Sequence, residues 1–206
     1  MRSLLAIVLA LLLIVPVPAG AFNWSGVAAK LKASSFSLKT WDGKEYCSGW
    51  VIDNRRDFGI TADHCVHGGW AETGIFVDGI EALKVDGNEE LDYAVLWIPG
   101  INRPELKPQH NPLRVGWEIA AFGSAREAGM YDHLRVGIIS AVNARVDDLE
   151  GRWTVFDQPG IGGMSGGPIV DTKGRVVSMT QRSDRRMIGI GKSIGEIWRA
   201  SRAFWR

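Results

Sequence analysis

The sequence predicts an all-β protein that is divided into two halves. Short apolar segments rich in valine, isoleucine, tryptophan and phenylalanine recur about every 8 to 12 residues, with glycine, aspartate and asparagine between them. Helical periodicity is scarce before the end of the chain. The stretch 99–112 interrupts the pattern with four prolines, and proline disfavours both helices and central strands. These observations predict two β-rich halves, about 28–98 and 113–195, joined by a linker over 99–112.

The expected strands follow in order along the two halves. They are the segments 49–52, 58–62, 74–77, 93–98, 118–122, 135–141, 153–156, 168–170 and 175–179. The polar segments 86–88 and 172–174 combine glycine with aspartate, asparagine or lysine, and such composition is typical of hairpin loops.

The tail from Lys192 to Arg206 is the one good helix candidate. The terminal helix itself is expected over 196–206. Ile194, Ile197 and Trp198 share one face of that helix. The sequence favours a terminal helix that docks on the β-structure. A basic amphipathic helix that binds a membrane or a partner is the alternative.

The first 21 residues have the features of a signal peptide. Arg2 precedes an apolar run over 4–15, and prolines then lead to the small-residue sequence Ala-Gly-Ala at 19–21. We therefore expect cleavage after Ala21, a mature domain over 22–195 with its terminal helix, and a secreted or periplasmic protein. An uncleaved membrane anchor is the alternative, and only in that case do we expect membrane contact.

Composition and cysteine content narrow the class of protein. The 206 residues are 46% apolar and 23% charged with a net charge of +1, which gives no reason to expect nucleic-acid binding. The two cysteines, Cys47 and Cys65, are expected to form a disulfide in an oxidising compartment. A metal site with His64 and His67 is the competing interpretation. The cysteines lack the close pairing of zinc ligands, so we expect no metal and no cofactor.

The segment Gly163-Met164-Ser165-Gly166-Gly167-Pro168 surrounds one serine with glycines. Glycine permits backbone angles closed to other residues and lets a ligand approach the main chain. A serine in this setting is typical of an acyl-transfer nucleophile, and we expect the N–H groups of Gly163 and Ser165 to hold the oxyanion. A glycine-rich turn without catalytic function is the alternative.

The order of the histidines decides between the hydrolase classes. The motif around Ser165 also fits the G-x-S-x-G pattern of α/β-hydrolases, in which the histidine follows the serine. Every histidine of this chain precedes Ser165, which excludes that order. These histidines are His64, His67, His110 and His133.

The order histidine, aspartate, serine remains open and assigns three roles. His64 follows a β-segment and is expected to take the proton of Ser165 during attack on a carbonyl. Asp92 begins an apolar strand, where a buried carboxylate needs a partner such as an imidazole N–H. We therefore expect Asp92 to orient His64. His67 lies in a glycine-rich turn and is the weaker candidate for the base.

At these residues the chain resembles the chymotrypsin-like (trypsin-fold) serine peptidases. The resemblance rests on Cys-Ser-Gly at 47–49, Thr-Ala-Asp-His-Cys at 61–65 and the motif at 163–168. The short spacing of His64, Asp92 and Ser165 is similar to the bacterial HtrA/Deg-type branch, but no PDZ domain is expected after the peptidase domain. The resemblance implies two six-stranded antiparallel β-barrels with the site in the cleft between them. It also implies an endopeptidase that cleaves protein or peptide substrates through an acyl-enzyme.

Several residues depart from the family pattern or concern specificity. Asp63 replaces a small residue beside His64 and raises the question whether it perturbs the base. Met164 cannot accept a salt bridge from a new amino terminus, so we expect no activation by proteolytic cleavage.

By resemblance the substrate pocket includes Pro159, Gln181 and Arg182, and a small or aliphatic side chain is the expected preference. A catalytically silent binding module and a membrane-tethered peptidase with one dedicated target are the alternatives.

Overall fold

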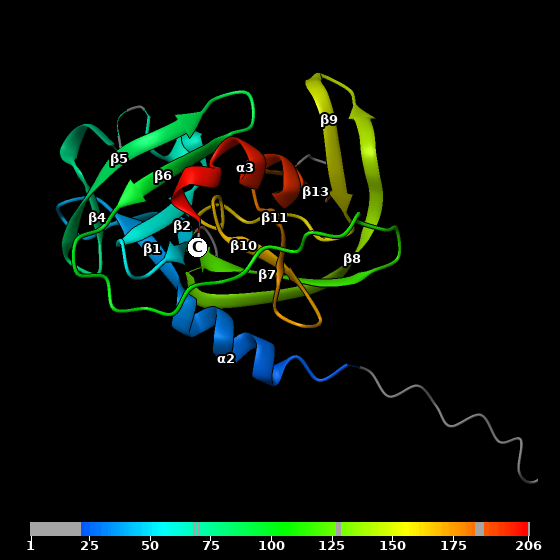
Figure 1. Cartoon of the computed structure of the whole chain (residues 1–206), viewed down its shortest axis with the longest axis horizontal. Helices are drawn as coiled ribbons and strands as arrows, with labels where there is room; N and C mark the ends of the chain where they lie inside the picture. The colour runs from blue at the N-terminus through cyan, green and yellow to red at the C-terminus, as the bar shows by residue number, and fades with distance from the viewer. Residues whose placement is uncertain (1–21, 68, 70, 127–128, 184–187, 206) are drawn as a thin grey trace, which may run out of the picture.

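The chain folds as two β-sheets that lie side by side, with helices at its margins (Figure 1). The computed structural model describes residues 22–67, 69, 71–126, 129–183 and 188–205. The predicted signal peptide, 1–21, lies outside the described residues. Within these ranges, no helix has the length and apolar character needed to cross a membrane. The predicted all-β class is confirmed.

The first half is a closed antiparallel barrel of six strands, in the order β1-β2-β3-β6-β5-β4. Its interior is filled by large apolar side chains such as Trp50, Leu38 and Leu96, each fully buried. The strands are β1 (Ser35–Lys39), β2 (Glu45–Asp53), β3 (Phe58–Thr61), β4 (Ile75–Val77), β5 (Ile80–Asn88) and β6 (Tyr93–Trp97).

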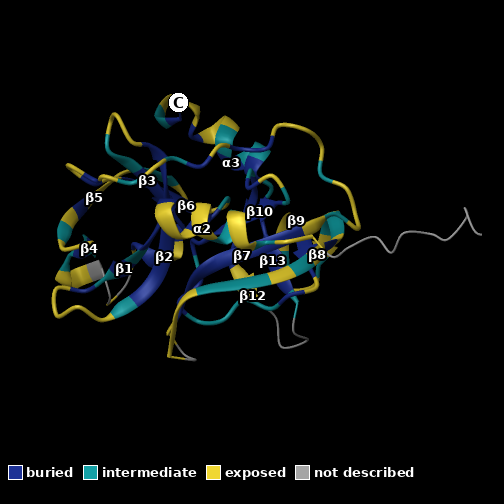
Figure 2. Cartoon of the chain, turned by 90° about the horizontal axis from the view of Figure 1, so that it is seen from below, coloured by how far each residue is buried: buried dark blue, intermediate teal, exposed yellow. Residues whose placement is uncertain are grey.

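The second half is one curled sheet, and its described residues form seven strands where the family resemblance implies six in a barrel. The strand order is β11-β10-β7-β8-β9-β13-β12, with every pairing antiparallel. Figure 2 shows β2 and β7 as buried where the two sheets meet, and the contacts between these strands join the halves. The strands are β7 (Glu118–Ala125), β8 (Met130–Val146), β9 (Leu149–Phe156), β10 (Pro168–Asp171), β11 (Val176–Met179), β12 (Arg182–Ser183) and β13 (Gly189–Gly191).

Two local expectations were wrong. An α-helix, α2 (Ser25–Ser34), occupies the start of the predicted first barrel, which therefore begins at Ser35. Only Leu31 and Ser34 of α2 are buried, so the sequence carries almost no amphipathic signal for it. The segment 86–88 belongs to β5 rather than to a hairpin loop, and the turn follows it. The predicted loop at 172–174 is confirmed, because Gly174 has a φ of +67° between β10 and β11.

The terminal helix is α3 (Ile194–Ala200), followed by a 3₁₀ turn over Arg202–Phe204. Ser193 and Glu196 form a capping box at its start. Ile194 and Ile197 are buried in the main apolar core, which includes the first barrel. The interpretation as a docked helix is therefore confirmed for α3.

A disulfide joins Cys47 in β2 to Cys65 at the end of the 3₁₀ turn Asp63–Cys65. The sequence separation is 18 residues, and both cysteines are buried. Because the bond closes a loop around β3, it restricts the unfolded chain more than the folded barrel. It also ties the 3₁₀ turn that carries His64 to the barrel wall.

We expect the double variant Cys47→Ala with Cys65→Ala to lose about 3 kcal/mol of unfolding free energy, the chain-entropy value for a loop of this size. Urea denaturation of the oxidised parent and the double variant measures the difference. The parent unfolded in the presence of a reductant is the control and should match the variant. Equal urea midpoints for the oxidised parent and the variant would show that the bond does not stabilise the fold.

Candidate active site

The serine motif forms a tight turn between the end of β9 and the start of β10. Gly163 and Gly166 both have positive φ angles, +100° and +82°. A Cβ atom would lie 2.5 Å from the Ser124 carbonyl oxygen at Gly163, and 2.2 Å from the Ser48 carbonyl oxygen at Gly166. Backbone angle and space therefore both require glycine at these two positions.

The turn leaves two backbone N–H groups without an acceptor. The N–H groups of Met164, Gly166 and Gly167 donate to carbonyl oxygens at 2.7–2.9 Å. Within the described part of the chain, the N–H groups of Gly163 and Ser165 make no hydrogen bond. Backbone groups in folded proteins are nearly always paired, so two free donors on either side of Met164 mark a site for an oxygen.

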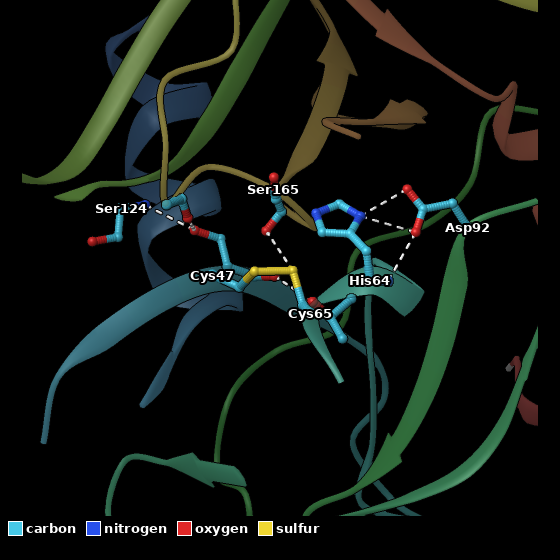
Figure 3. Close-up of a disulfide and its surroundings, with 9 residues drawn as sticks. Cys47, His64, Cys65, Asp92, Ser124 and Ser165 are labelled. Atoms are coloured by element: carbon cyan, nitrogen blue, oxygen red, sulfur yellow. Dashed lines mark hydrogen bonds and ion pairs between the residues drawn. A yellow bond between two sulfur atoms is a disulfide. The ribbon is translucent and has the colours of Figure 1, made fainter. Parts of the chain in front are cut away.

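Ser48 of β2 fixes the turn from the first barrel. This fully buried serine donates from its backbone N–H to the Ser165 carbonyl and from Oγ to the Gly163 carbonyl, both at 2.8 Å. Its Oγ also accepts the Ser124 N–H of β7 at 2.9 Å (Figure 3). Ser48 thus fixes the peptide groups 163–164 and 165–166, which lie on either side of the peptide that carries the Ser165 N–H. Sequence reasoning assigned Ser48 no role, and a small polar residue inside a buried strand was its only signal.

The side chains of His64 and Asp92 contact each other beside the serine turn. The Nδ1 atom of His64 lies 3.0 and 2.9 Å from the two carboxylate oxygens of Asp92, and the His64 backbone N–H donates to Asp92 at 3.0 Å. The Asp92 side chain is 6% exposed and that of His64 is 46% exposed. In Figure 3 the imidazole stands between Asp92 and Ser165, with its second ring nitrogen on the Ser165 side. No hydrogen bond joins the Ser165 hydroxyl to this second nitrogen.

Gln181 holds the backbone that carries Asp92. Its Nε2 donates to the carbonyl oxygens of Leu91 and Asp92 at 2.7 and 2.8 Å, and its Oε1 accepts the Lys192 N–H at 2.6 Å. Asp92 has a φ of +50°, an uncommon conformation for a residue with a side chain. The buried amide therefore fixes this turn of the first barrel against the second sheet. The sequence placed Gln181 in the substrate pocket, whereas its amide is engaged here.

Asp63, next to His64 in sequence, directs its carboxylate elsewhere. It accepts a hydrogen bond from Lys84 Nζ at 2.8 Å, and His67 Nε2 lies 3.0 Å from its other oxygen. The side chain is 4% exposed, and Lys84 offsets its charge. His67 is thus engaged with Asp63 and Lys84, away from Ser165. Burial, together with the charge of Asp86, raises the pKa of Tyr93, which follows Asp92, to about 12.

The other candidate residues fall into two groups. Pro159 and Arg182 line a small pocket beside Met164. Cys47, Cys65 and His64 lie close enough together to suggest a metal site, but the two sulfur atoms are bonded to each other. Metals bind the thiolate form of cysteine, so these two sulfurs do not supply that type of ligand.

Comparisons with known proteins identify the family and support the fold. The family model of the trypsin-like peptidase domain matches residues 47–179. No curated protein sequence matches the chain. The active form of the Rv3671c protease from M. tuberculosis has a TM-score of 0.74 at 20% identity, covering 91% of this chain and 87% of that one.

Two further solved structures show the same fold. The HtrA-type protease AlgW with a tripeptide has a TM-score of 0.73 at 22% identity, covering 88% of this chain. This chain spans 63% of AlgW, less than two thirds of its length. The serine endoprotease from Yersinia pestis has a TM-score of 0.73 at 20% identity, covering 89% of this chain and 67% of that one.

The family model covers well over half of the chain, and its match includes His64, Asp92 and Ser165. The two-sheet architecture, with the serine turn at the seam between the sheets, is the arrangement that the family resemblance implied. The chain therefore belongs to the trypsin-like peptidase domain family and is a serine endopeptidase.

Proposed function

We propose that this peptidase is exported and cleaves peptide bonds through a triad of His64, Asp92 and Ser165, by way of an acyl-enzyme. The observation that carries the proposal is the contact of His64 Nδ1 with both Asp92 oxygens, beside a turn whose two free N–H groups flank Met164. Together these groups supply a base, an orienting carboxylate and an oxyanion site.

The geometry assigns one task to each group in the reaction. Asp92 accepts a hydrogen bond from the Nδ1–H of His64, which leaves Nε2 free to take the Ser165 proton as Oγ attacks the scissile carbonyl. The carbonyl oxygen gains negative charge and accepts hydrogen bonds from the N–H groups of Gly163 and Ser165. His64 then gives its proton to the leaving amine, and the acyl group stays on Ser165. Water then attacks the acyl carbonyl as His64 takes its proton, and His64 returns that proton to Ser165 Oγ as the acid leaves.

Export and substrate class rest on further features. The apolar amino terminus with its Ala-Gly-Ala sequence and the disulfide between Cys47 and Cys65 both support a secreted or periplasmic protein. AlgW, which shares the fold, has been solved with a tripeptide and with a decapeptide. That likeness supports a protein or peptide substrate for this chain.

The triad is tested by labelling the mature protein with a fluorophosphonate probe. We expect the parent to be labelled and Ser165→Ala to remain unlabelled. His64→Ala should be labelled at least about a thousandfold more slowly, since the hydroxyl then lacks its base. Ser140→Ala, which changes an exposed serine of β8, is the control and should be labelled like the parent. A folded parent that never reacts would instead favour a silent binding module.

Gln181 is expected to act as a positioning residue for Asp92. We predict that Gln181→Met lowers kcat on a peptide substrate about tenfold or more, with little change in KM, because the Asp92 turn loses its clamp. Steady-state kinetics on enzyme counted by active-site titration measure this. Gln109→Met removes another buried glutamine, whose Oε1 accepts the Asn111 N–H and which makes no hydrogen bond with Leu91 or Asp92, and should leave kcat unchanged. A Gln181→Met enzyme with parental kcat and only a lowered melting temperature would reduce Gln181 to a structural role.

A further inference from the structure

A recess of the surface lies between the end of the linker, the β8–β9 hairpin and α3, and we call it the hairpin pocket. The hairpin and α3 are neighbours in Figure 1. The free volume is about 520 Å³, within the range of small-molecule sites. None of His64, Asp92 and Ser165 lines the hairpin pocket, so it is distinct from the candidate active site. Its wall consists of the segments 109–113, 142–143, 152–154 and 193–196 together with Arg199.

Two arginines of this wall are held in place without an acidic partner. Arg152 of β9 donates from Nη1 to the Asn143 carbonyl at 3.0 Å, and Arg199 of α3 donates from Nε to the Gly195 carbonyl at 2.7 Å. Neither guanidinium forms an ion pair with any residue in the described part of the chain. A guanidinium has five N–H donors, so both arginines retain donors for a ligand. Their backbone contacts also lower the cost of ordering these long side chains when a ligand binds.

The buried Lys192 lies next to the same wall. It is 3% exposed, and its Nζ donates to the Arg152 carbonyl at 3.2 Å and lies 4.0 Å from the centroid of the Trp153 ring. Among the described residues, no carboxylate pairs with this ammonium group. The aromatic ring attracts the cation, but a buried charge is costly unless an opposite charge offsets it. An anion bound beside Arg152 would supply that opposite charge.

Glu196 also lines the hairpin pocket, and its charge is already engaged. Its Oε2 accepts the N–H and the hydroxyl of Ser193 at 3.2 and 2.6 Å, as part of the cap of α3. Three cations, Arg152, Arg199 and Lys192, outweigh this one carboxylate. The surroundings of the pocket are therefore positive and favour an anionic ligand.

Apolar side chains form another part of the wall. Leu113 and Val142 are half-buried, and both line the pocket while packing against the core of the second sheet. Trp153 uses its Nε1 to donate to the Glu150 carbonyl at 2.8 Å, so the rest of its ring is an apolar surface. Such a wall favours a ligand that carries an apolar group beside its charge.

We propose that the hairpin pocket binds a carboxylate attached to an apolar group, with Arg152 and Arg199 as partners of the carboxylate. Guanidinium groups offer the planar pairs of N–H donors that a carboxylate accepts. The apolar group then lies against Leu113 and Val142. A free organic acid and the carboxyl end of a peptide both have this chemistry. The proposal does not depend on the triad, because the pocket contains none of its residues.

An NMR titration of the protein with N-acetyl-leucine tests the site, at low ionic strength and at pH 8, where histidine charge contributes little. The resonance of the Trp153 indole N–H reports binding. We expect N-acetyl-leucine to bind at least about tenfold more tightly than its uncharged amide, which offers no charge to the arginines. It should exceed acetate by a similar factor, because acetate lacks the apolar group. Equal affinities for N-acetyl-leucine and either analogue would overturn the proposal.

Arginine variants locate the bound carboxylate. Arg152→Gln and Arg199→Gln should each weaken N-acetyl-leucine binding about tenfold, since each removes a charged donor. Both side chains are exposed, so the fold should be retained. Arg145→Gln is the matched control, because Arg145 is an exposed arginine of the same hairpin that does not line the pocket. Parental affinity in the Arg152→Gln, Arg199→Gln double variant would place the ligand elsewhere, the catalytic cleft included, and refute the proposal.

A longer peptide that ends in leucine distinguishes the two sources of the carboxylate. It is added to the Ser165→Ala protein, so that it stays intact. Binding that is lost in the double arginine variant would assign the pocket to the carboxyl end of a chain, whereas binding of N-acetyl-leucine alone would assign it to a free organic acid. Fluorophosphonate labelling of the parent is a separate measurement. A parent that is not labelled at Ser165 would refute the triad and leave this binding test unaffected.

Discussion

The candidate site depends on the way in which Ser48 holds the serine turn. This buried residue of β2 binds the carbonyls of Gly163 and Ser165 and receives the Ser124 N–H of β7. These bonds fix the peptide groups on either side of the one that carries the Ser165 N–H, and the N–H groups of Gly163 and Ser165 have no acceptor among the described residues. In the proposed mechanism these two N–H groups form an oxyanion site before substrate arrives, so we expect that no new amino terminus is needed to shape it. Met164, which is fully buried, fits this account because it packs in the core beneath the turn.

The same seam between the sheets positions the proposed base, His64, and its carboxylate, Asp92. His64 and Asp92 belong to the first barrel, whereas Gln181 reaches from the second sheet to the Leu91 and Asp92 carbonyls. The disulfide ties the His64 turn to β2, the strand that also carries Ser48. Neither sheet alone holds all the groups, so the relative position of the sheets sets the geometry of the site. A dense set of buried hydrogen bonds at the seam keeps that position within a narrow range.

Much of the fold and of the candidate site could be predicted from local sequence patterns. The strand-length apolar segments, the order of His64, Asp92 and Ser165, and the glycines of the turn all carry their information in neighbouring residues. Helix α2 could not be predicted, because only two of its residues are buried and no periodic signal results. The contacts of Ser48 and Gln181 join residues far apart in the chain, and nothing nearby in sequence specifies them. Asp63 is next to His64 in sequence, and the sequence does not show where its carboxylate is directed. The structure shows that it contacts Lys84 and His67.

The central claim is that Ser165 attacks a carbonyl whose oxygen is held by the Gly163 and Ser165 N–H groups. A crystal structure of the protein after reaction with a peptidyl phosphonate tests this most directly. The account predicts a bond from phosphorus to Ser165 Oγ and a phosphonyl oxygen about 2.7–3.1 Å from both nitrogen atoms. His64 Nε2 should face the leaving-group side of the adduct. An adduct on another residue, or a phosphonyl oxygen directed into solvent with both N–H groups still unpaired, would contradict the account.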